Sequence, residues 1–127
     1  MADLKRDDQT AFQAVLALQT RVKPDVVDEK IINEFIQLLE HESPMVRECA
    51  VVALGKIGDP GGIPPLIRAL GDTYDDYEWR LAVQASNALE KIGEPAVPFL
   101  IEALDNPNEN IRSRAAQTLK TIIDRRV

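Results

Sequence analysis

The sequence is poor in the residues that crosslink a fold, bind metals or build aromatic cores. Of its 127 residues, one is a cysteine, Cys49, and one is a histidine, His41. A single cysteine excludes an intrachain disulfide, and a single histidine excludes a three-histidine zinc site or a multi-histidine di-iron site within one chain. Aromatic residues make up only 5% of the chain, which disfavours a sheet held together by aromatic cross-strand pairs. We therefore expect an all-α protein that needs no metal or cofactor.

Long apolar runs and an excess of basic residues are also missing. No uninterrupted apolar segment approaches the ~18 residues of a membrane-spanning helix, and residues 1–8 lack the apolar core of a signal peptide. The chain has 15 Lys and Arg against 21 Asp and Glu, a net charge of −6, which is the wrong sign for binding a phosphate backbone. We expect a cytoplasmic protein with no membrane span and no nucleic-acid partner.

What the sequence does contain is an internal repeat. The segments 53–58 and 88–93 both read Ala-Leu-x-Lys-Ile-Gly, and residues 110–123 repeat the surrounding pattern more loosely. These copies alternate with short apolar segments that end on Leu39, Leu70 and Leu104. The interval between successive leucines is a little over thirty positions, a period typical of helical solenoids, in which each unit buries its apolar face only against its neighbours.

The apolar spacing within each unit predicts two helices. In the second helix of a unit, apolar residues recur at three- and four-residue intervals, as at Val46, Ala50 and Leu54. Ser43-Pro44 predicts a helix start, and Gly58 and Gly93 predict helix ends with left-handed backbone. Seven helices are expected in all, near residues 8–22, 25–40, 44–57, 62–70, 76–92, 95–104 and 109–124.

These motifs resemble the HEAT-like repeats named after phycobilisome lyases. The unit of that family reads roughly Val-Arg-x-x-Ala-Ala-x-Ala-Leu-Gly-x-Ile-Gly, followed by a proline-containing helix of the form Leu-Ile-x-Ala-Leu. The similarity covers about residues 35–123. It implies a right-handed α-solenoid of about three to three and a half repeats in a single domain. The expected units are an N-terminal cap or half repeat at 1–24 and repeats at 25–58, 59–93 and 94–127.

The resemblance also implies a range of functions. Members of this family include bilin lyase subunits, phycobilisome degradation factors and many small adaptor proteins. We expect a non-catalytic scaffold or adaptor that mediates protein–protein interaction. The alternative is a bilin lyase or isomerase subunit, or an accessory factor that handles phycobiliproteins.

One enzyme resemblance is rejected on the residues themselves. The segments 43–47 and 53–55 also look like deoxyhypusine hydroxylase, a HEAT-repeat enzyme whose His-Glu pairs would fall here on Glu48 and Cys49. The chain's one His-Glu dipeptide, His41-Glu42, has no second copy. Gly61-Gly62 likewise lacks the Lys-Ser/Thr of a phosphate-binding loop. We therefore predict that the chain is not an enzyme.

Two arginines occupy the same register at the start of second helices. Arg47 follows Glu40 and Arg112 follows Asp105, each by seven positions. The guanidinium group suits bidentate pairing with a carboxylate in a partly desolvated turn. We expect these arginines to tie adjacent turns together, with ligand binding as the alternative.

One turn departs from the repeat and is the predicted binding site. Arg47 and Arg112 each follow the last leucine of the preceding helix by eight positions, but Arg80 follows Leu70 by ten, which indicates two extra residues. This turn holds both tyrosines and the only tryptophan, beside several acids, and aromatic residues on loops often carry recognition. We expect it to bind a protein with a basic contact surface, through Tyr74, Asp75, Asp76, Tyr77, Trp79, Val83 and Asn87. The alternative for Trp79 is a core position equivalent to that of Val46 and Ile111.

Three equivalent rows of residues run along the second helices. By the geometry of the family, they are expected on the concave face, either as a binding surface or as an ordinary solvated face. The rows are Glu48, Val52 and Gly55, then Val83, Asn87 and Glu90, then Ser113, Gln117 and Lys120.

The charge distribution is uneven along the chain. Residues 72–110 carry nine acids and two bases, whereas residues 111–127 carry five bases and one acid. Complementary ends of this kind predict weak, charge-assisted, head-to-tail self-association.

Overall fold

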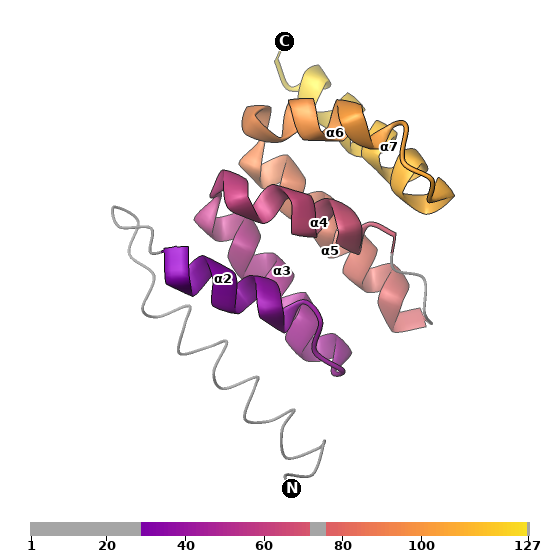
Figure 1. Ribbon diagram of the computed structural model, residues 1–127. Coiled ribbons are helices and arrows are strands. Elements are labelled where there is room, and N and C mark those ends of the chain that lie inside the picture. Colours follow the sequence, from indigo (N-terminus) through magenta and orange to yellow (C-terminus); the bar gives the residue numbers. More distant parts are fainter. Residues whose placement is uncertain (1–28, 72–75, 127) are drawn as a thin grey trace, which may run out of the picture.

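The computed structural model describes residues 29–71 and 76–126, with residues 76–80 described as backbone alone. This part of the chain is all-α and forms three stacked helix pairs, as the repeat pattern predicts. Figure 1 shows the first helices of the pairs in one layer and the second helices in a layer behind them. The helices are α2 (Glu29–Leu38), α3 (Pro44–Ile57), α4 (Ile63–Ala69), α5 (Asp76–Ile92), α6 (Val97–Ala103) and α7 (Glu109–Asp124).

The helix bounds agree closely with the sequence pattern, apart from two short turns. The segments Pro60–Gly62 and Glu94–Ala96 are 3-10 turns that precede α4 and α6, so these two α-helices are shorter than expected. The predicted helix at residues 8–22 lies outside the described residues. No helix within the described residues is both long and apolar enough to cross a bilayer.

The ends of the second helices follow from local chemistry. Ser43 occupies the N-cap position of α3, but its side chain makes no capping bond; its backbone N–H instead donates to Nδ1 of His41 over 3.0 Å. Gly58 ends α3 with φ 72° and ψ 14°, the left-handed conformation that glycine adopts without a Cβ penalty. Gly93 also has a positive φ of 77°, but its ψ of −131° lies outside the left-handed helical region, so that prediction is only half right.

The core is a continuous apolar layer between the two rows of helices. It includes Phe35, Leu66 and Leu100 from the first helices, and Leu54 and Leu89 from the second helices, all essentially inaccessible to water. No single pair could bury these side chains alone, which is why the stacking of pairs stabilises the fold.

The seam between α3 and α5 is the most extensive helix contact in the described chain. Gly55 allows this contact, because a Cβ atom at its position would lie 2.7 Å from the Cβ atom of Ala88 and 2.8 Å from its Cα atom. The absence of a side chain therefore lets the two backbones approach directly. Gly55 was predicted to lie on the concave row, and this prediction is wrong because the residue is buried in the seam.

We predict that Gly55→Ala destabilises the protein although alanine is the better helix former. Overpacking should cost about 1–3 kcal/mol, which offsets or exceeds the gain in helix propensity of about 1 kcal/mol. Urea unfolding followed by circular dichroism measures the difference. Lys120→Ala is the control, since Lys120 has the same register on α7 and is exposed there; it should stay within about 0.5 kcal/mol. A Gly55→Ala variant more stable than the wild type would contradict the close contact.

Candidate functional site

The register of α5 corrects the size of the insertion. Leu89 follows Leu70 by nineteen positions, whereas Leu54 follows Leu39 and Leu119 follows Leu104 by fifteen. Four residues are therefore inserted rather than two. Arg80 was a misleading marker, because the position of Arg47 and Arg112 is occupied in α5 by Ala82.

Most of the insertion is helical. Helix α5 begins thirteen positions before Leu89, whereas α3 begins ten positions before Leu54. The added residues thus lengthen α5 by almost one turn, and the predicted site residues Asp76, Tyr77 and Trp79 lie in the backbone of this extra turn. Their side chains, and Tyr74 and Asp75 altogether, lie outside the described residues.

The core position considered for Trp79 belongs to another residue. Leu81 stands in α5 where Val46 and Ile111 stand in α3 and α7, and it is buried like them. The register therefore assigns Trp79 to the turn before the core stripe begins. The Val46 register is thus filled by Leu81, while the side chain of Trp79 lies outside the described residues, so its packing stays a prediction.

Val83 and Asn87 are the predicted site residues that the structure describes fully. Both are exposed on α5, and the apolar side chain of Val83 is 39% accessible. Ser113 and Gln117 are exposed at the same register on α7, while Glu48 and Val52 are half-buried on α3. We call these six residues the outer row; it crosses all three second helices.

Glu90 does not belong to the outer row, contrary to prediction. Its side chain is only 19% accessible, because it turns into the seam between α5 and α7 and pairs with Arg125 over 3.1 Å. The neighbouring Arg126 makes a bidentate pair with Glu94, with Nε to Oε2 at 2.8 Å and Nη2 to Oε1 at 2.6 Å. Arg125 thus fastens the end of α7 to α5 of the preceding repeat, and Arg126 fastens it to the 3-10 turn that precedes α6 in the same repeat.

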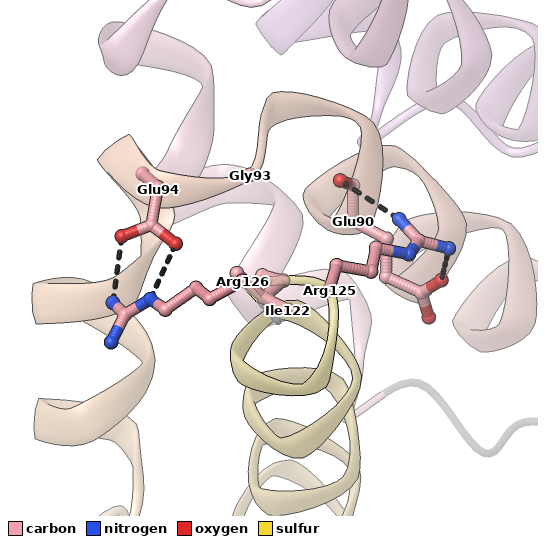
Figure 2. Close-up of a pocket in the computed structure, with 6 residues that line it drawn as sticks. All are labelled: Glu90, Gly93, Glu94, Ile122, Arg125 and Arg126. Atoms are coloured by element: carbon pink, nitrogen blue, oxygen red, sulfur yellow. Dashed lines mark hydrogen bonds and ion pairs between the residues drawn. The ribbon is translucent and has the colours of Figure 1, made fainter.

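The two ion pairs border an open cleft of about 440 Å³. Figure 2 shows Arg125 and Arg126 reaching in opposite directions from the end of α7, with Gly93 and Ile122 between them. The Arg126 guanidinium holds the pKa of Glu94 below its ordinary value, by its hydrogen bonds first and its charge second. Both carboxylates of the cleft are therefore paired with an arginine.

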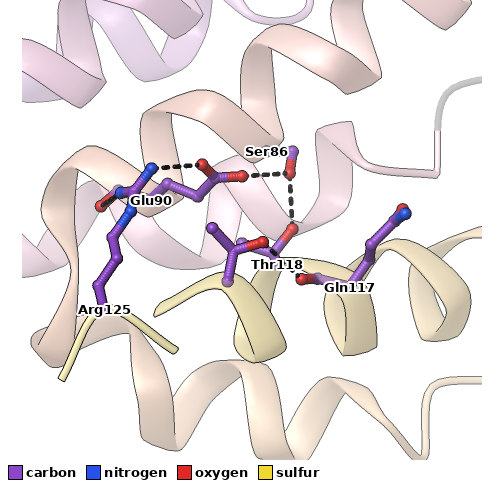
Figure 3. A network of polar contacts seen from close by, with 6 residues as sticks. Ser86, Glu90, Gln117, Thr118 and Arg125 are labelled. Atoms are coloured by element: carbon purple, nitrogen blue, oxygen red, sulfur yellow. Dashed lines mark hydrogen bonds and ion pairs between the residues drawn. The ribbon is translucent and has the colours of Figure 1, made fainter. Parts of the chain in front are cut away.

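A second polar link crosses the same seam. The hydroxyl groups of Ser86 and Thr118 lie 2.6 Å apart (Figure 3). Thr118 also donates to the backbone carbonyl of Arg114 over 2.7 Å. Because the Thr118 proton is used in that bond, Ser86 donates to Thr118. Thr118 is 1% accessible and is the buried polar residue of the described core.

Sequence reasoning missed this link, although a signal was present. Thr118 stands at the register of Ala53 and Ala88, and Ser86 at the register of Val51. Two hydroxyl residues thus replace apolar ones at positions that face each other across one seam. Comparing the three second helices position by position would have revealed the pair.

The register arginines tie turns, but through backbone carbonyls. Nη1 of Arg47 donates to the carbonyls of His41 and Glu42, at 2.5 and 2.9 Å. Nη1 of Arg112 donates in the same way to Asn106 and Pro107, at 2.7 and 3.0 Å. Within the described residues no ion pair joins Arg112 to Asp105, so the predicted carboxylate partner is wrong there, because the carbonyls of the turn lie within reach instead.

Two further features bear on reactivity, namely the Cys49 thiol and the grouping of side chains that could bind a metal. Burial raises the pKa of the Cys49 thiol, and the charge of Glu48 raises it further, so the thiol stays protonated at neutral pH. In residues 29–71 and 76–126, no group of three or more His, Cys, Asp or Glu side chains is placed to hold a metal ion.

Comparison with known families gives three matches along the chain. A model described as HEAT repeats matches residues 2–87, which is two thirds of the sequence. A model of the HEAT repeat matches residues 96–125, and a model of the PBS lyase HEAT-like repeat matches residues 81–106. The comparison with curated proteins finds no match.

We predict that Thr118→Val destabilises the fold by about 1–3 kcal/mol, because it removes the acceptor that lies 2.6 Å from the half-buried Ser86 hydroxyl and leaves that hydroxyl only the long contact of 3.5 Å to the Glu90 carboxylate. Thr121→Val is the matched control, since Thr121 also donates to the carbonyl four residues earlier but crosses no seam. Thermal and urea unfolding should show the control within about 0.5 kcal/mol of wild type. Equal losses in the two variants would indicate a general threonine effect in α7.

The Glu94–Arg126 pair predicts a pH effect of defined sign. Because the pKa of Glu94 is lowered in the folded chain, the pair stabilises the fold above the ordinary glutamate pKa, and this stabilisation is lost as the pH falls through the lowered value. A titration of the Glu94 carboxyl carbon by NMR should show its midpoint rising in Arg126→Gln. Arg125→Gln should leave that midpoint unchanged, and an equal rise in both variants would refute the specific pair.

Proposed function

The chain belongs to the HEAT-repeat family, and from this premise we propose that it is a non-catalytic module that binds another protein through the outer row. HEAT repeats generally mediate protein–protein interaction. The proposed role assigns no catalytic step to any side chain. It is that of a scaffold or adaptor in the cytoplasm.

The observation that carries the proposal is the exposure of Val83 and Asn87 in the middle of the second-helix layer. They are flanked by Ser113 and Gln117 on one side and by Glu48 and Val52 on the other. These side chains are small or polar and extend over three helices, which suits a protein surface or an extended segment better than a small molecule.

The chemistry of the outer row favours a basic partner. It contains one carboxylate, Glu48, and no basic residue, and the extra turn of α5 adds acids at Asp76 and Glu78. Aromatic residues in the same turn, Tyr77 and Trp79, supply the kind of residue that dominates binding energy at protein interfaces. We therefore propose that the extra turn and the outer row form one binding surface.

We predict that Val83→Lys weakens partner binding by about 1–3 kcal/mol, because it places a positive charge against a basic surface and removes an apolar contact. The partner would be isolated on immobilised wild-type protein from native extract, and its affinity measured by titration calorimetry. Gln37→Lys is the control, since it adds the same charge on α2, in the other layer. A proposal based on the outer row fails if both variants bind as the wild type does, or if both lose affinity equally.

The inserted segment is tested separately by Tyr74→Ala combined with Tyr77→Ala. A loss of affinity with unfolding stability within about 1 kcal/mol supports a binding role. Unchanged affinity with lowered stability would assign these tyrosines to packing.

A second candidate function rests on the match of residues 81–106 to the PBS lyase HEAT-like repeat. It is the handling of phycobiliproteins, as a lyase or isomerase subunit or as an accessory factor. Visible absorption after incubation with a phycobiliprotein apo-subunit and free bilin separates the two candidates. Attachment or isomerisation of the bilin that depends on this chain would favour the second.

A further inference from the structure

The pair α6 and α7 has one edge that no described helix covers. In α4, Ile63, Ile67 and Leu70 are buried, with accessibilities of 0, 8 and 0%. Their equivalents in α6 are Val97, Ile101 and Leu104, of which Ile101 is 53% and Leu104 37% accessible. The difference shows that these side chains face the direction in which the next helix pair stacks.

The second helices show the same change. Val51 and Gly55 of α3 are buried under α5, whereas Ala116 and Lys120, at the same register of α7, are exposed. Ile123 on this face is 41% accessible. We define the terminal edge as Ile101, Leu104 and Asp105 of the α6 side with Arg112, Ala116 and Ile123 of the α7 side; Figure 1 shows α6 and α7 at one end of the stack.

Each seam inside the stack has a glycine at one of two registers, Gly55 with Glu40 in the first and Gly71 with Glu90 in the second, whereas this edge has a glycine at neither. A Cβ atom on Gly71 would lie 2.8 Å from Cγ1 of Ile111, so this glycine admits the next repeat closely. Its equivalent on the terminal edge is Asp105, and the equivalent of Gly55 is Lys120. Side chains with charge therefore fill the two places where a closely stacked repeat would enter.

A layer that covers the edge must therefore match charge as well as apolar surface. The seam between α5 and α7 shows how this is done, since Glu90 at the Gly55 register is matched there by Arg125. On the terminal edge the α6 side is acidic, because residues 94–111 contain no Lys or Arg. The α7 side carries the bases Arg112 and Lys120, both exposed, with Lys120 also paired to Asp124.

This layout is self-complementary under two-fold symmetry. Helices α6 and α7 are antiparallel neighbours joined by a short turn, so Asp105 and Arg112 lie at the same end of the edge. A two-fold axis parallel to both helices would place α6 of one copy over α7 of the other. Asp105 would then meet Arg112 of the second copy, and this contact would occur twice. Ile101 would lie over Ala116, since each is four residues from the charged residue on its own side of the turn.

We propose that the terminal edge binds a second copy of this chain as a symmetric, weak dimer. The face is about 24 Å long, from the 16 residues of α7, and about 20 Å wide. Roughly 500 Å² per copy is below the ~800 Å² of a standard interface, so a dissociation constant of about 0.1–1 mM is expected. Charge matching makes the association sensitive to salt.

Sedimentation equilibrium of the full chain, from about 20 μM to 2 mM at low and high salt, tests the proposal. The expected result is a reversible monomer–dimer equilibrium that weakens as salt is added. Ile101→Lys should raise the dissociation constant at least about tenfold, because it places an ammonium group in the apolar centre of the face. Ile101 is already exposed, so circular dichroism should show an unchanged fold.

Two further variants separate the edge from other surfaces. Met45→Lys is the matched control, since Met45 is also an exposed apolar residue but lies at the start of α3; its dimerisation should equal that of wild type. Asp105→Arg should weaken the dimer, because it places like charges opposite each other. A strictly monomeric wild type, equal effects of Ile101→Lys and Met45→Lys, or masses that grow beyond the dimer as head-to-tail stacking requires, would each overturn the proposal.

Discussion

The direct approach of α3 and α5 at Gly55 is the constraint from which the remaining architecture follows. A glycine on one helix and an alanine on the other bring two backbones close enough for direct contact in the first seam. The next seam cannot be sealed in this way, because Glu90 occupies the glycine register. There the contact is made by hydroxyl groups, by Arg125, and by Arg114, which donates to the carbonyl of Leu70 over 2.5 Å. One repeat pattern thus supports two chemically different seams.

Periodicity alone predicted most of the fold. The recurring Ala-Leu-x-Lys-Ile-Gly segment fixed the ends of α3 and α5 to within a residue, because the apolar stripe and the terminal glycine are local features. Contacts between repeats were harder to predict. Whether Glu90 faces water or Arg125, and whether Thr118 meets Ser86, depends on how far one helix lies from the next, and a single sequence indicates the register of each helix but not that spacing.

The candidate site was predicted in part for a similar reason. Val83 and Asn87 were placed correctly on an exposed face because they lie four residues apart on a helix whose buried stripe was already known. The insertion was miscounted because Arg80 was taken as the equivalent of Arg47. Apolar residues in the core tolerate less change than a surface arginine, so Leu89 was the safer reference for counting.

Ala82 stands in α5 where the other two described second helices have an arginine. In the other two described pairs an arginine at this register binds two carbonyls of the preceding turn and so fixes the length and path of that turn. Alanine cannot do so, and the connection before α5 is released from that requirement. The four residues inserted between Leu70 and Leu89 belong to the same pair in which this arginine is replaced, so the loss of the arginine and the change in spacing occur together.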